Sequence, residues 1–207
     1  MPLLTTALLP VPLAPEISLH LAGDEVGLFD LTGGEFHSDQ PPPYWAFVWA
    51  GGQALARYLL DHPDAVHGCH VLDLAAGSGV AAIAAAKAGA AHVTAADVDP
   101  AAAGAIRRNA TANGVVVAVG SDIQPADVVL AGDAFYSASV AQRMTTLLRD
   151  QARRGARVLV GDPGRGYFPE RLFDRLAEYV VPVPTALEET ETLLTGVYEM
   201  RVTPRSG

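Results

Sequence analysis

Apolar residues along the chain follow two alternating patterns. Short, nearly continuous apolar runs predict buried strands, which cover residues 71–74, 92–96, 115–119, 127–131 and 158–161. Between these runs apolar residues recur at helical spacing, and one such segment places Leu55, Tyr58 and Leu59 on one face of a helix over 51–61. Strands that alternate with helices are typical of βαβ units. The pattern therefore predicts an α/β fold with a mostly parallel sheet and helices on both faces.

The C-terminal part of the chain departs from this alternation. Residues 170–179 predict one more helix. Residues 180–183 and 193–202 then predict two strands with no long helix between them. Two such strands would form an antiparallel hairpin at the edge of the sheet.

The N-terminal part has a different, mixed texture. It ends in Gln40 followed by three prolines, after which the regular pattern begins. Residues 16–31 contain short alternating stretches and Gly-Asp turn signals, which favour a small β-hairpin. We therefore predict an N-terminal appendage over residues 1–43 and the main domain over residues 44–207.

Composition and charge narrow the class of protein. The chain has 207 residues, half of them hydrophobic, which suffices for the core of one domain. Its 14 basic and 23 acidic residues give a formal charge of −9, which argues against binding to the phosphates of nucleic acid. The single cysteine, Cys69, allows no intramolecular disulfide, and we find no export signal and no run of about 18 apolar residues. We predict a cytoplasmic protein that does not enter a membrane. The six histidines are scattered and predict no metal site.

A glycine-rich turn follows the first strong strand, where residues 73–79 are Asp-Leu-Ala-Ala-Gly-Ser-Gly. In open α/β sheets ligands bind at the carboxyl ends of the strands, and glycines let the backbone approach them closely. The helix after Gly79 directs its positive end at the same place. The next strand ends at Asp97, about 20 residues further on, where a carboxylate can hold both hydroxyls of a ribose.

Two nucleoside cofactors fit such a turn. Residues 77–82 satisfy the Gly-x-Gly-x-x-Gly/Ala pattern of dinucleotide sites, so NAD has to be considered. A dinucleotide site presents helix amides to a pyrophosphate, and the carboxylate of Asp73 would repel that group. S-adenosylmethionine has no phosphate and carries an ammonium and a sulfonium, which a carboxylate attracts. Asp73 therefore favours S-adenosylmethionine over NAD.

Residues 71–79, Val-Leu-Asp-Leu-Ala-Ala-Gly-Ser-Gly, resemble the first motif of class I S-adenosylmethionine-dependent methyltransferases. One residue departs from that motif, since Ala75 stands where the family usually has glycine. We expect its small methyl group to be tolerated in a slightly less permissive loop. The resemblance implies a Rossmann-like fold with a seven-stranded, mostly parallel sheet, and a reaction that leaves S-adenosylhomocysteine as product.

Three further segments resemble one branch of this class, the seven-β-strand lysine methyltransferases, and most closely those that modify the beta subunit of electron transfer flavoprotein. They are residues 43–56 (Pro-Tyr-Trp-Ala-Phe-Val-Trp-Ala-Gly-Gly-Gln-Ala-Leu-Ala), 132–136 (Gly-Asp-Ala-Phe-Tyr) and 161–165 (Gly-Asp-Pro-Gly-Arg). The resemblance covers most of the chain from about Glu16. It implies transfer to a protein lysine, with that flavoprotein subunit as the expected partner and a ribosomal protein as a second one.

The resemblance assigns the donor site to residues around the glycine turn. Asp73 would hold the methionine end, Asp97 and then Asp99 the ribose, and Asp122 the amino group of adenine. The other residues expected to touch the donor are Trp49, Ala75, Gly77, Ser78, Gly79 and Ala131. Plainer roles stay open: Asp73 as a cap of loop amides, Asp99 as a helix cap, Asp122 as a surface acid and Trp49 as a core residue.

The acceptor side is assigned to the segment after the fourth strand. Asp133 would orient the attacking lysine nitrogen, and Phe135 and Tyr136 would form apolar walls that favour a neutral amine. We therefore assign the catalytic roles to Asp133 and Tyr136. The alternative for Asp133 is that it caps the next helix.

Residues further from the reacting atoms are assigned to the substrate. Tyr44 and Trp45 would frame its entrance, and Arg165 would meet an acidic surface on it. Packing of the appendage and a tight turn are the alternatives for these residues. Two other functions also stay open at this point, a methyltransferase for small amines or N-heterocycles and a module that binds the donor without catalysis.

Overall fold

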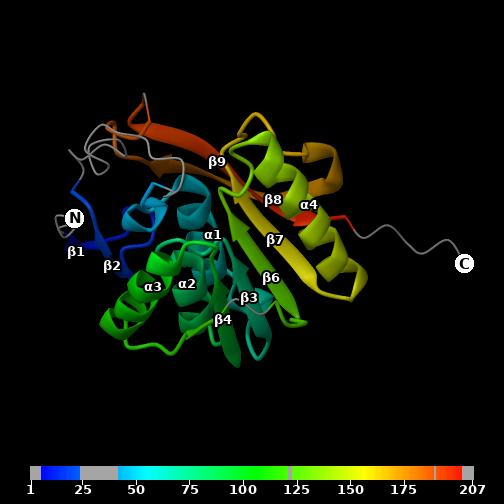
Figure 1. The fold of residues 1–207 in the computed structure, drawn as a ribbon, viewed down its shortest axis with the longest axis horizontal. Helices are drawn as coiled ribbons and strands as arrows, with labels where there is room; N and C mark the ends of the chain where they lie inside the picture. The colour runs from blue at the N-terminus through cyan, green and yellow to red at the C-terminus, as the bar shows by residue number, and fades with distance from the viewer. Residues whose placement is uncertain (1–5, 24–41, 121–122, 189, 202–207) are drawn as a thin grey trace, which may run out of the picture.

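The computed structural model describes residues 6–23, 42–120, 123–188 and 190–201. Its centre is a seven-stranded sheet in the order β5-β4-β3-β6-β7-β9-β8 (Figure 1). The first five strands in this order pair in parallel, and β9 pairs antiparallel with both β7 and β8. The strands are β3 (His70–Leu74), β4 (His92–Ala96), β5 (Ala118–Val119), β6 (Val128–Gly132), β7 (Arg157–Asp162), β8 (Phe173–Pro182) and β9 (Thr192–Met200). The predicted mostly parallel sheet with an antiparallel edge hairpin is confirmed.

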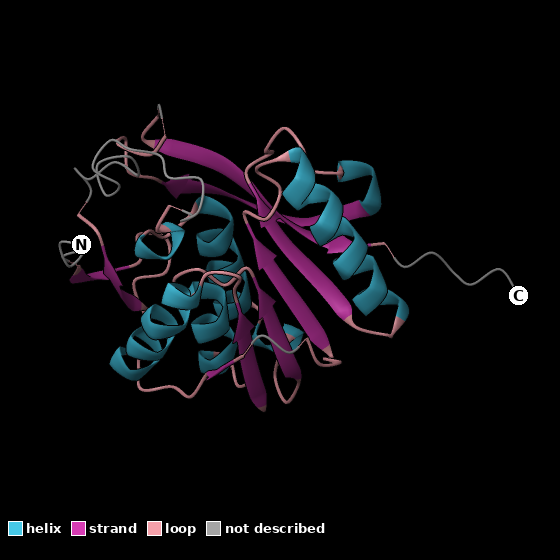
Figure 2. Cartoon of the chain, viewed as in Figure 1, coloured by secondary structure: helices cyan, strands magenta, loops and turns pink. Residues whose placement is uncertain are grey.

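Helices cover both faces of this sheet (Figure 2). They are α1 (Ala50–Asp61), α2 (Val80–Lys87), α3 (Pro100–Ala112) and α4 (Ala138–Arg153), with short 3-10 turns η2 (Tyr44–Ala46), η3 (Pro63–Ala65) and η4 (Glu170–Leu172). The first three helices share one hydrophobic core with one face of the sheet, and α4 shares a second core with the other face. The predicted α/β layering is therefore confirmed. Within the described ranges, no helix has both the length and the apolar character needed to cross a membrane.

The N-terminal part forms a separate two-stranded antiparallel sheet, in which β1 (Ala7–Pro10) pairs with β2 (Ser18–Leu21). This hairpin starts earlier in the chain than the one predicted within residues 16–31, of which 24–31 lie outside the described residues. It is bound to the main domain, because Ile17 and Leu19 are fully buried in the core that also contains α1, α2 and α3.

One predicted element is wrong. The expected helix over residues 170–179 is a single 3-10 turn followed by β8, which continues to Pro182. β8 pairs along its length with β9, from Phe173 opposite Met200 to Pro182 opposite Thr192. Pairing with a strand that comes later in the chain overrides the local helical pattern, which carries no information about that partner.

The order of the strands defines where a ligand can bind. β3 has β4 on one side and β6 on the other. The strands up to β5 are added on one side of β3, and the strands from β6 onward are added on the other side. At such a switch point the loops after adjacent parallel strands diverge and leave a crevice at the carboxyl ends. The glycine turn after β3 and the segment after β6 both lie at this edge of the sheet.

Candidate functional site

The glycine turn after β3 adopts the left-handed backbone that its glycines allow. The φ angles are +54° at Ala75, +53° at Gly77 and +83° at Gly79, which is the N-cap of α2. Ala75 therefore adopts a conformation that costs an L-residue about 1–2 kcal/mol, as its departure from the glycine of the family motif suggested. Asp97 stabilises the turn by accepting a hydrogen bond from the N–H of Gly77 at 2.8 Å.

Asp73, at the end of β3, is almost fully buried beneath this turn, with 2% of its surface exposed. Its Oδ2 accepts a hydrogen bond from the N–H of Ala82 in the first turn of α2 at 3.0 Å. Burial raises the pKa of Asp73 to about 7, and the nearby Asp97 adds to the rise. Asp73 thus accepts from one backbone amide, and no described basic side chain forms a salt bridge with it. The carboxylate of Asp73 fits the ammonium group of S-adenosylmethionine.

The acids after β4 divide into two roles. Asp97 uses Oδ2 for the glycine turn and Oδ1 for the N–H of Asp99 at 2.9 Å, so its carboxylate is held in a fixed orientation. Asp99 is the N-cap of α3 and accepts from the N–H of Ala101 at 2.8 Å, which confirms the helix-cap interpretation. The predicted adenine ligand, Asp122, lies outside the described residues.

Aromatic side chains from two distant segments meet beside the turn. Tyr44 lies 5.8 Å from Trp49 and 5.7 Å from Tyr136, measured between ring centroids. The indole N–H of Trp49 donates to the carbonyl of Tyr44 at 3.0 Å. Trp45 lies over the turn, since a Cβ on Gly77 would come within 4.0 Å of its Cα. The structure therefore brings together the expected donor-side and acceptor-side aromatic residues, and Tyr136 remains half-exposed.

Asp133, one residue after β6, binds the N-terminus of α1. Its Oδ2 accepts from the N–H groups of Gly51 at 2.5 Å and Gly52 at 3.2 Å. The next helix has another cap, Ser137, so the suggestion that Asp133 caps that helix is wrong. Burial raises the pKa of Asp133, and Arg165 and the two amides offset part of this rise. Like Ala75, Asp133 has a positive φ, of +51°.

Glycines allow α1 to come this close to the sheet. A Cβ on Gly51 would collide with the carbonyl oxygen of Gly161 in β7, and one on Gly161 would collide with the carbonyl of Gly51. A Cβ on Gly132 would lie 2.9 Å from the backbone N of Gly52. The backbones of α1, β6 and β7 are thus in direct contact. This contact brings the N–H groups at the start of α1 within hydrogen-bonding distance of Asp133.

Arg165 joins two acids above Trp49. Its Nη2 lies 3.2 Å from Oδ1 of Asp133 and 2.7 Å from Oε1 of Glu188, and its guanidinium carbon is 5.8 Å from the centre of the Trp49 ring. Burial works against the charge of Arg165, but its two acidic partners raise its pKa above the ordinary value. The guanidinium of Arg165 was expected to contact the substrate, but in the structure it pairs with Asp133 and Glu188.

Asp162 adds a third acid to this place. It is fully buried at the end of β7, where its Oδ1 accepts from the N–H groups of Gly164 and Arg165 at 2.8 and 2.7 Å. Its Oδ2 is buried and has no hydrogen-bond partner among the residues that the structure describes. Burial, together with the nearby Asp133, raises the pKa of Asp162 to about 6. Three carboxylates with one guanidinium give this part of the site an excess of acidic groups.

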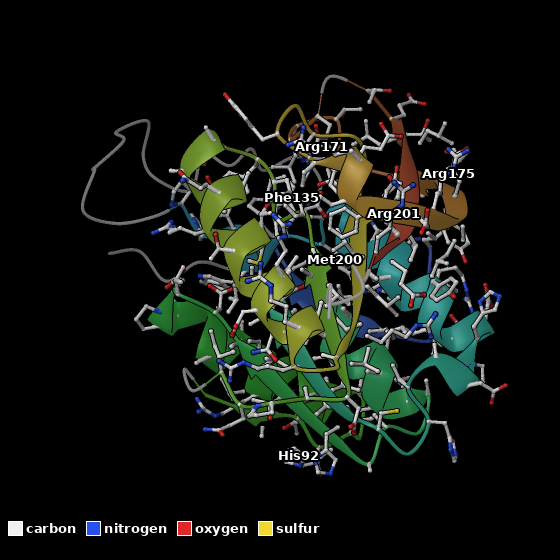
Figure 3. The ribbon with its side chains drawn as sticks, turned by 90° about the vertical axis from the view of Figure 1, so that its right-hand side faces the viewer. His92, Phe135, Arg171, Arg175, Met200 and Arg201 are labelled. Carbon is white, nitrogen blue, oxygen red and sulfur yellow. The ribbon has the colours of Figure 1, made fainter. Side chains whose placement is uncertain are left out.

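Two predicted site residues lie in the core instead. Phe135 has no exposed surface and packs against Phe168 and Phe173 at 5.3 and 6.3 Å between ring centroids, in the same core as Met200 (Figure 3). Ala131, in β6, is also fully buried. The side chain of Tyr136 is therefore accessible to an incoming substrate, and the side chain of Phe135 is not.

Three polar residues that position these segments were missed in the sequence. Asn109 and Gln53 are fully buried inside α3 and α1, and Glu188 extends to Arg165 from the connection between β8 and β9. A polar amide among apolar helical positions was a usable signal for Asn109 and Gln53, because buried amides are hydrogen-bonded. Glu188 gave no such signal, since only the tertiary fold brings it near Arg165.

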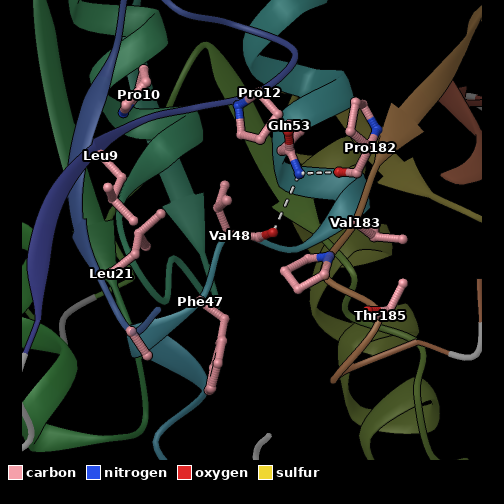
Figure 4. A pocket seen from close by; sticks show the side chains of 12 residues that line it. Leu9, Pro10, Pro12, Leu21, Phe47, Val48, Gln53, Pro182, Val183 and Thr185 are labelled. Atoms are coloured by element: carbon pink, nitrogen blue, oxygen red, sulfur yellow. Dashed lines mark hydrogen bonds between the residues drawn. The ribbon is translucent and has the colours of Figure 1, made fainter. Parts of the chain in front are cut away.

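A cavity of about 430 Å³ lies on a neighbouring face, between the N-terminal hairpin and the end of β8 (Figure 4). Gln53 lies at this cavity, donating to the carbonyls of Val48 and Pro182 at 3.4 and 3.0 Å and accepting from the N–H of Leu13 at 3.2 Å. Its lining contains none of the residues of the glycine turn. Among the described residues, no three His, Cys, Asp or Glu side chains are placed to hold a metal ion.

Comparisons with known proteins find two kinds of protein methyltransferase. The model of the ribosomal protein L11 methyltransferase (PrmA) family matches residues 54–150. The electron transfer flavoprotein beta subunit lysine methyltransferase of Xenopus laevis is 39% identical over 186 residues, which cover 81% of this chain and 72% of the frog protein. The homolog of that enzyme in Caenorhabditis elegans is 31% identical over 224 residues, which cover 91% of this chain and 90% of the worm protein.

Solved structures agree on the fold. The ribosomal protein L11 methylase from Lactobacillus delbrueckii subsp. bulgaricus superposes with a TM-score of 0.52 at 20% sequence identity, covering 73% of this chain and 79% of that chain. At this identity the likeness concerns the fold alone, which is the predicted Rossmann-like methyltransferase fold.

Proposed function

The chain belongs to the family of electron transfer flavoprotein beta subunit lysine methyltransferases, and from this membership we propose that it methylates a lysine of that flavoprotein subunit. It is a class I methyltransferase that uses S-adenosylmethionine. The observation that carries the acceptor is the acidic and aromatic cluster at the ends of β6 and β7, where Asp133, Asp162 and Glu188 surround one arginine beside Trp49. A lysine ammonium is attracted to such a place by the carboxylates and by the ring.

The reaction is an in-line displacement at carbon, so the main tasks of the protein are positioning and the exclusion of water. When bound, S-adenosylmethionine supplies a methyl group on a positively charged sulfur. The lysine nitrogen must lose its proton before its lone pair can form the new N–C bond. Desolvation next to Tyr44 and Tyr136 lowers the pKa of an amine and favours that loss. The proton passes to solvent at the half-exposed side of Tyr136.

Asp133 has a positioning role in this scheme. Both of its oxygens already accept hydrogen bonds, Oδ2 from α1 and Oδ1 from Arg165. It therefore holds Trp49, the N-cap of α1, and Arg165 in fixed relation to the end of β6. The lysine meets a site whose walls Asp133 keeps in place.

A ribosomal protein is the second candidate acceptor. The match to the L11 methyltransferase family ends at residue 150 and so includes the glycine turn and Tyr136 but not Arg165 or Glu188. Those residues, with Tyr44 before the match, lie on the side that we assign to the acceptor. The flavoprotein subunit is favoured because two relatives named for its methylation cover 81% and 91% of this chain, more than the L11 family match covers. A cytoplasmic location stays a prediction.

The test is transfer of radiolabelled methyl groups from S-adenosylmethionine to proteins of a cell extract by the purified enzyme. The proposal predicts one labelled band at the size of the flavoprotein beta subunit, which Tyr136→Ala abolishes while donor binding persists. A labelled ribosomal protein would reject the flavoprotein subunit and support the second candidate acceptor. Label only in small molecules would reject both.

A further inference from the structure

The side chain of Asn109 connects two parts of the molecule that are far apart in sequence. It is fully buried in α3. Its Nδ2 donates to the carbonyl of Ser78, in the middle of the glycine turn, at 2.9 Å. Its Oδ1 accepts from the backbone N–H of His20 in β2 at 2.8 Å. A backbone carbonyl can only accept and a backbone N–H can only donate, so these two partners define the orientation of the amide.

The side chain of His20 adds to this contact. Its Nδ1 lies 3.1 Å from the same Oδ1 of Asn109. An amide oxygen can only accept, so Nδ1 carries the proton in this hydrogen bond. The N-terminal hairpin therefore donates two hydrogen bonds to the amide oxygen of Asn109, while the amide nitrogen donates to the glycine turn.

The glycine turn needs external support. Ala75 has a positive φ, and a non-glycine residue in this conformation persists only when its surroundings hold it. The N–H of Gly77 is held by Asp97 and the carbonyl of Ser78 by Asn109. Ile106, one turn before Asn109 in α3, packs against Gly79, where a Cβ would lie 3.2 Å from its Cγ2.

We propose that Asn109 is a positioning residue for the methyl donor, and that the N-terminal hairpin contributes to donor affinity through it. With its amide held by β2, Asn109 fixes the Ser78 carbonyl and thereby the shape of the turn that receives S-adenosylmethionine. The hairpin acts on the donor site from a distance, through one buried side chain.

A control residue for this proposal lies one turn further along the chain. Asn113 accepts from the N–H of Ser18 at 3.0 Å and donates to its carbonyl at 2.6 Å. It thus binds the same hairpin strand but makes no hydrogen bond to the turn. Asn113→Ala should lower stability and leave the Kd of the donor within about twofold of the wild type.

The experiment measures the Kd of S-adenosylmethionine by calorimetry and the unfolding midpoint of each full-length variant. Asn109→Ala should raise Kd about tenfold, which corresponds to the loss of one buried hydrogen bond. Asn109→Asp should raise it at least as much, because it still accepts from His20 but turns a carboxylate oxygen toward the Ser78 carbonyl. At saturating donor, kcat should stay within about threefold of the wild type.

The proposal is overturned if both Asn109 variants bind the donor as tightly as Asn113→Ala. Should Asn109→Ala fail to fold, His20→Ala decides, since it removes only a partly exposed ring. It should raise the donor Kd about threefold, and an unchanged Kd would overturn the proposal. The Kd and unfolding measurements decide the proposal and need no acceptor, so they remain valid if the proposed acceptor is wrong.

Discussion

Replacing Asp133 should damage the protein through α1 before it affects chemistry. In Asp133→Ala the N–H groups of Gly51 and Gly52 lose their acceptor in a place where both glycines are buried. Each unsatisfied buried donor costs about 1–3 kcal/mol, so the expected loss in the free energy of unfolding is about 2–6 kcal/mol. That is a large part of the roughly 5–15 kcal/mol that stabilises an ordinary domain.

Asp133→Asn separates this structural role from the charge. Asparagine tolerates the positive φ of this position and keeps one oxygen that can accept from the two amides. Its amide nitrogen would face the Nη2 of Arg165, and we expect a loss of about 1–2 kcal/mol. Glu188→Gln is the matched control, because it changes the other acidic partner of Arg165 and touches neither amide.

The assay is urea unfolding followed by circular dichroism, with donor binding measured on the same preparations. The expected order of stability is wild type, Glu188→Gln, Asp133→Asn and Asp133→Ala, with equal denaturant slopes. If Asp133→Ala unfolds within about 1 kcal/mol of the wild type, the account of Asp133 as the anchor of α1 is refuted.

Four further predictions concern the two sides of the site. Because the pKa of Asp73 is raised to about 7 in the free protein, donor affinity should rise as the pH increases from about 5 to 8, and Asp73→Asn should remove that rise in a calorimetric titration. The same raised pKa means that the stability contributed by the protonated carboxyl is present below its ordinary value of 3.8 and is lost as the pH rises through about 7, which unfolding of the donor-free protein at several pH values checks. Ala75→Gly should stabilise the protein by about 0.5–1 kcal/mol by relieving its positive φ, whereas the same change at Ala103, further inside α3, should destabilise it by a similar amount, as urea unfolding checks. Tyr136→Ala should lower kcat/KM for the protein acceptor about 100-fold with the donor Kd within threefold, and equal losses in both would contradict its place on the acceptor side.

The sequence predicted the sheet and the glycine turn after β3 well, because their signals are local. Apolar runs mark the parallel strands, and the turn after β3 contains its own glycines and Asp73. Residues 170–179 show the limit of such signals, since Phe173 and Leu176 fit a helical repeat while pairing with β9 makes the segment a strand.

The contacts around Asp133, Tyr136 and Arg165 could be predicted only in part. Asp133, Tyr136 and Arg165 were found by resemblance, but their contacts depend on how α1, β7 and the β8–β9 connection meet. Neither the capping of α1 by Asp133 nor the approach of Glu188 has a sequence signal, because the partners are distant in the chain. The burial of Phe135 follows from its packing with Phe168, which the segment after β6 alone does not reveal.

The most direct test of the central claim is mass spectrometry of purified electron transfer flavoprotein beta subunit after incubation with this enzyme and S-adenosylmethionine. We expect the subunit to gain whole methyl groups on lysine with the wild-type enzyme and not with Tyr136→Ala. A subunit of unchanged mass, under conditions in which the enzyme binds the donor, would contradict it.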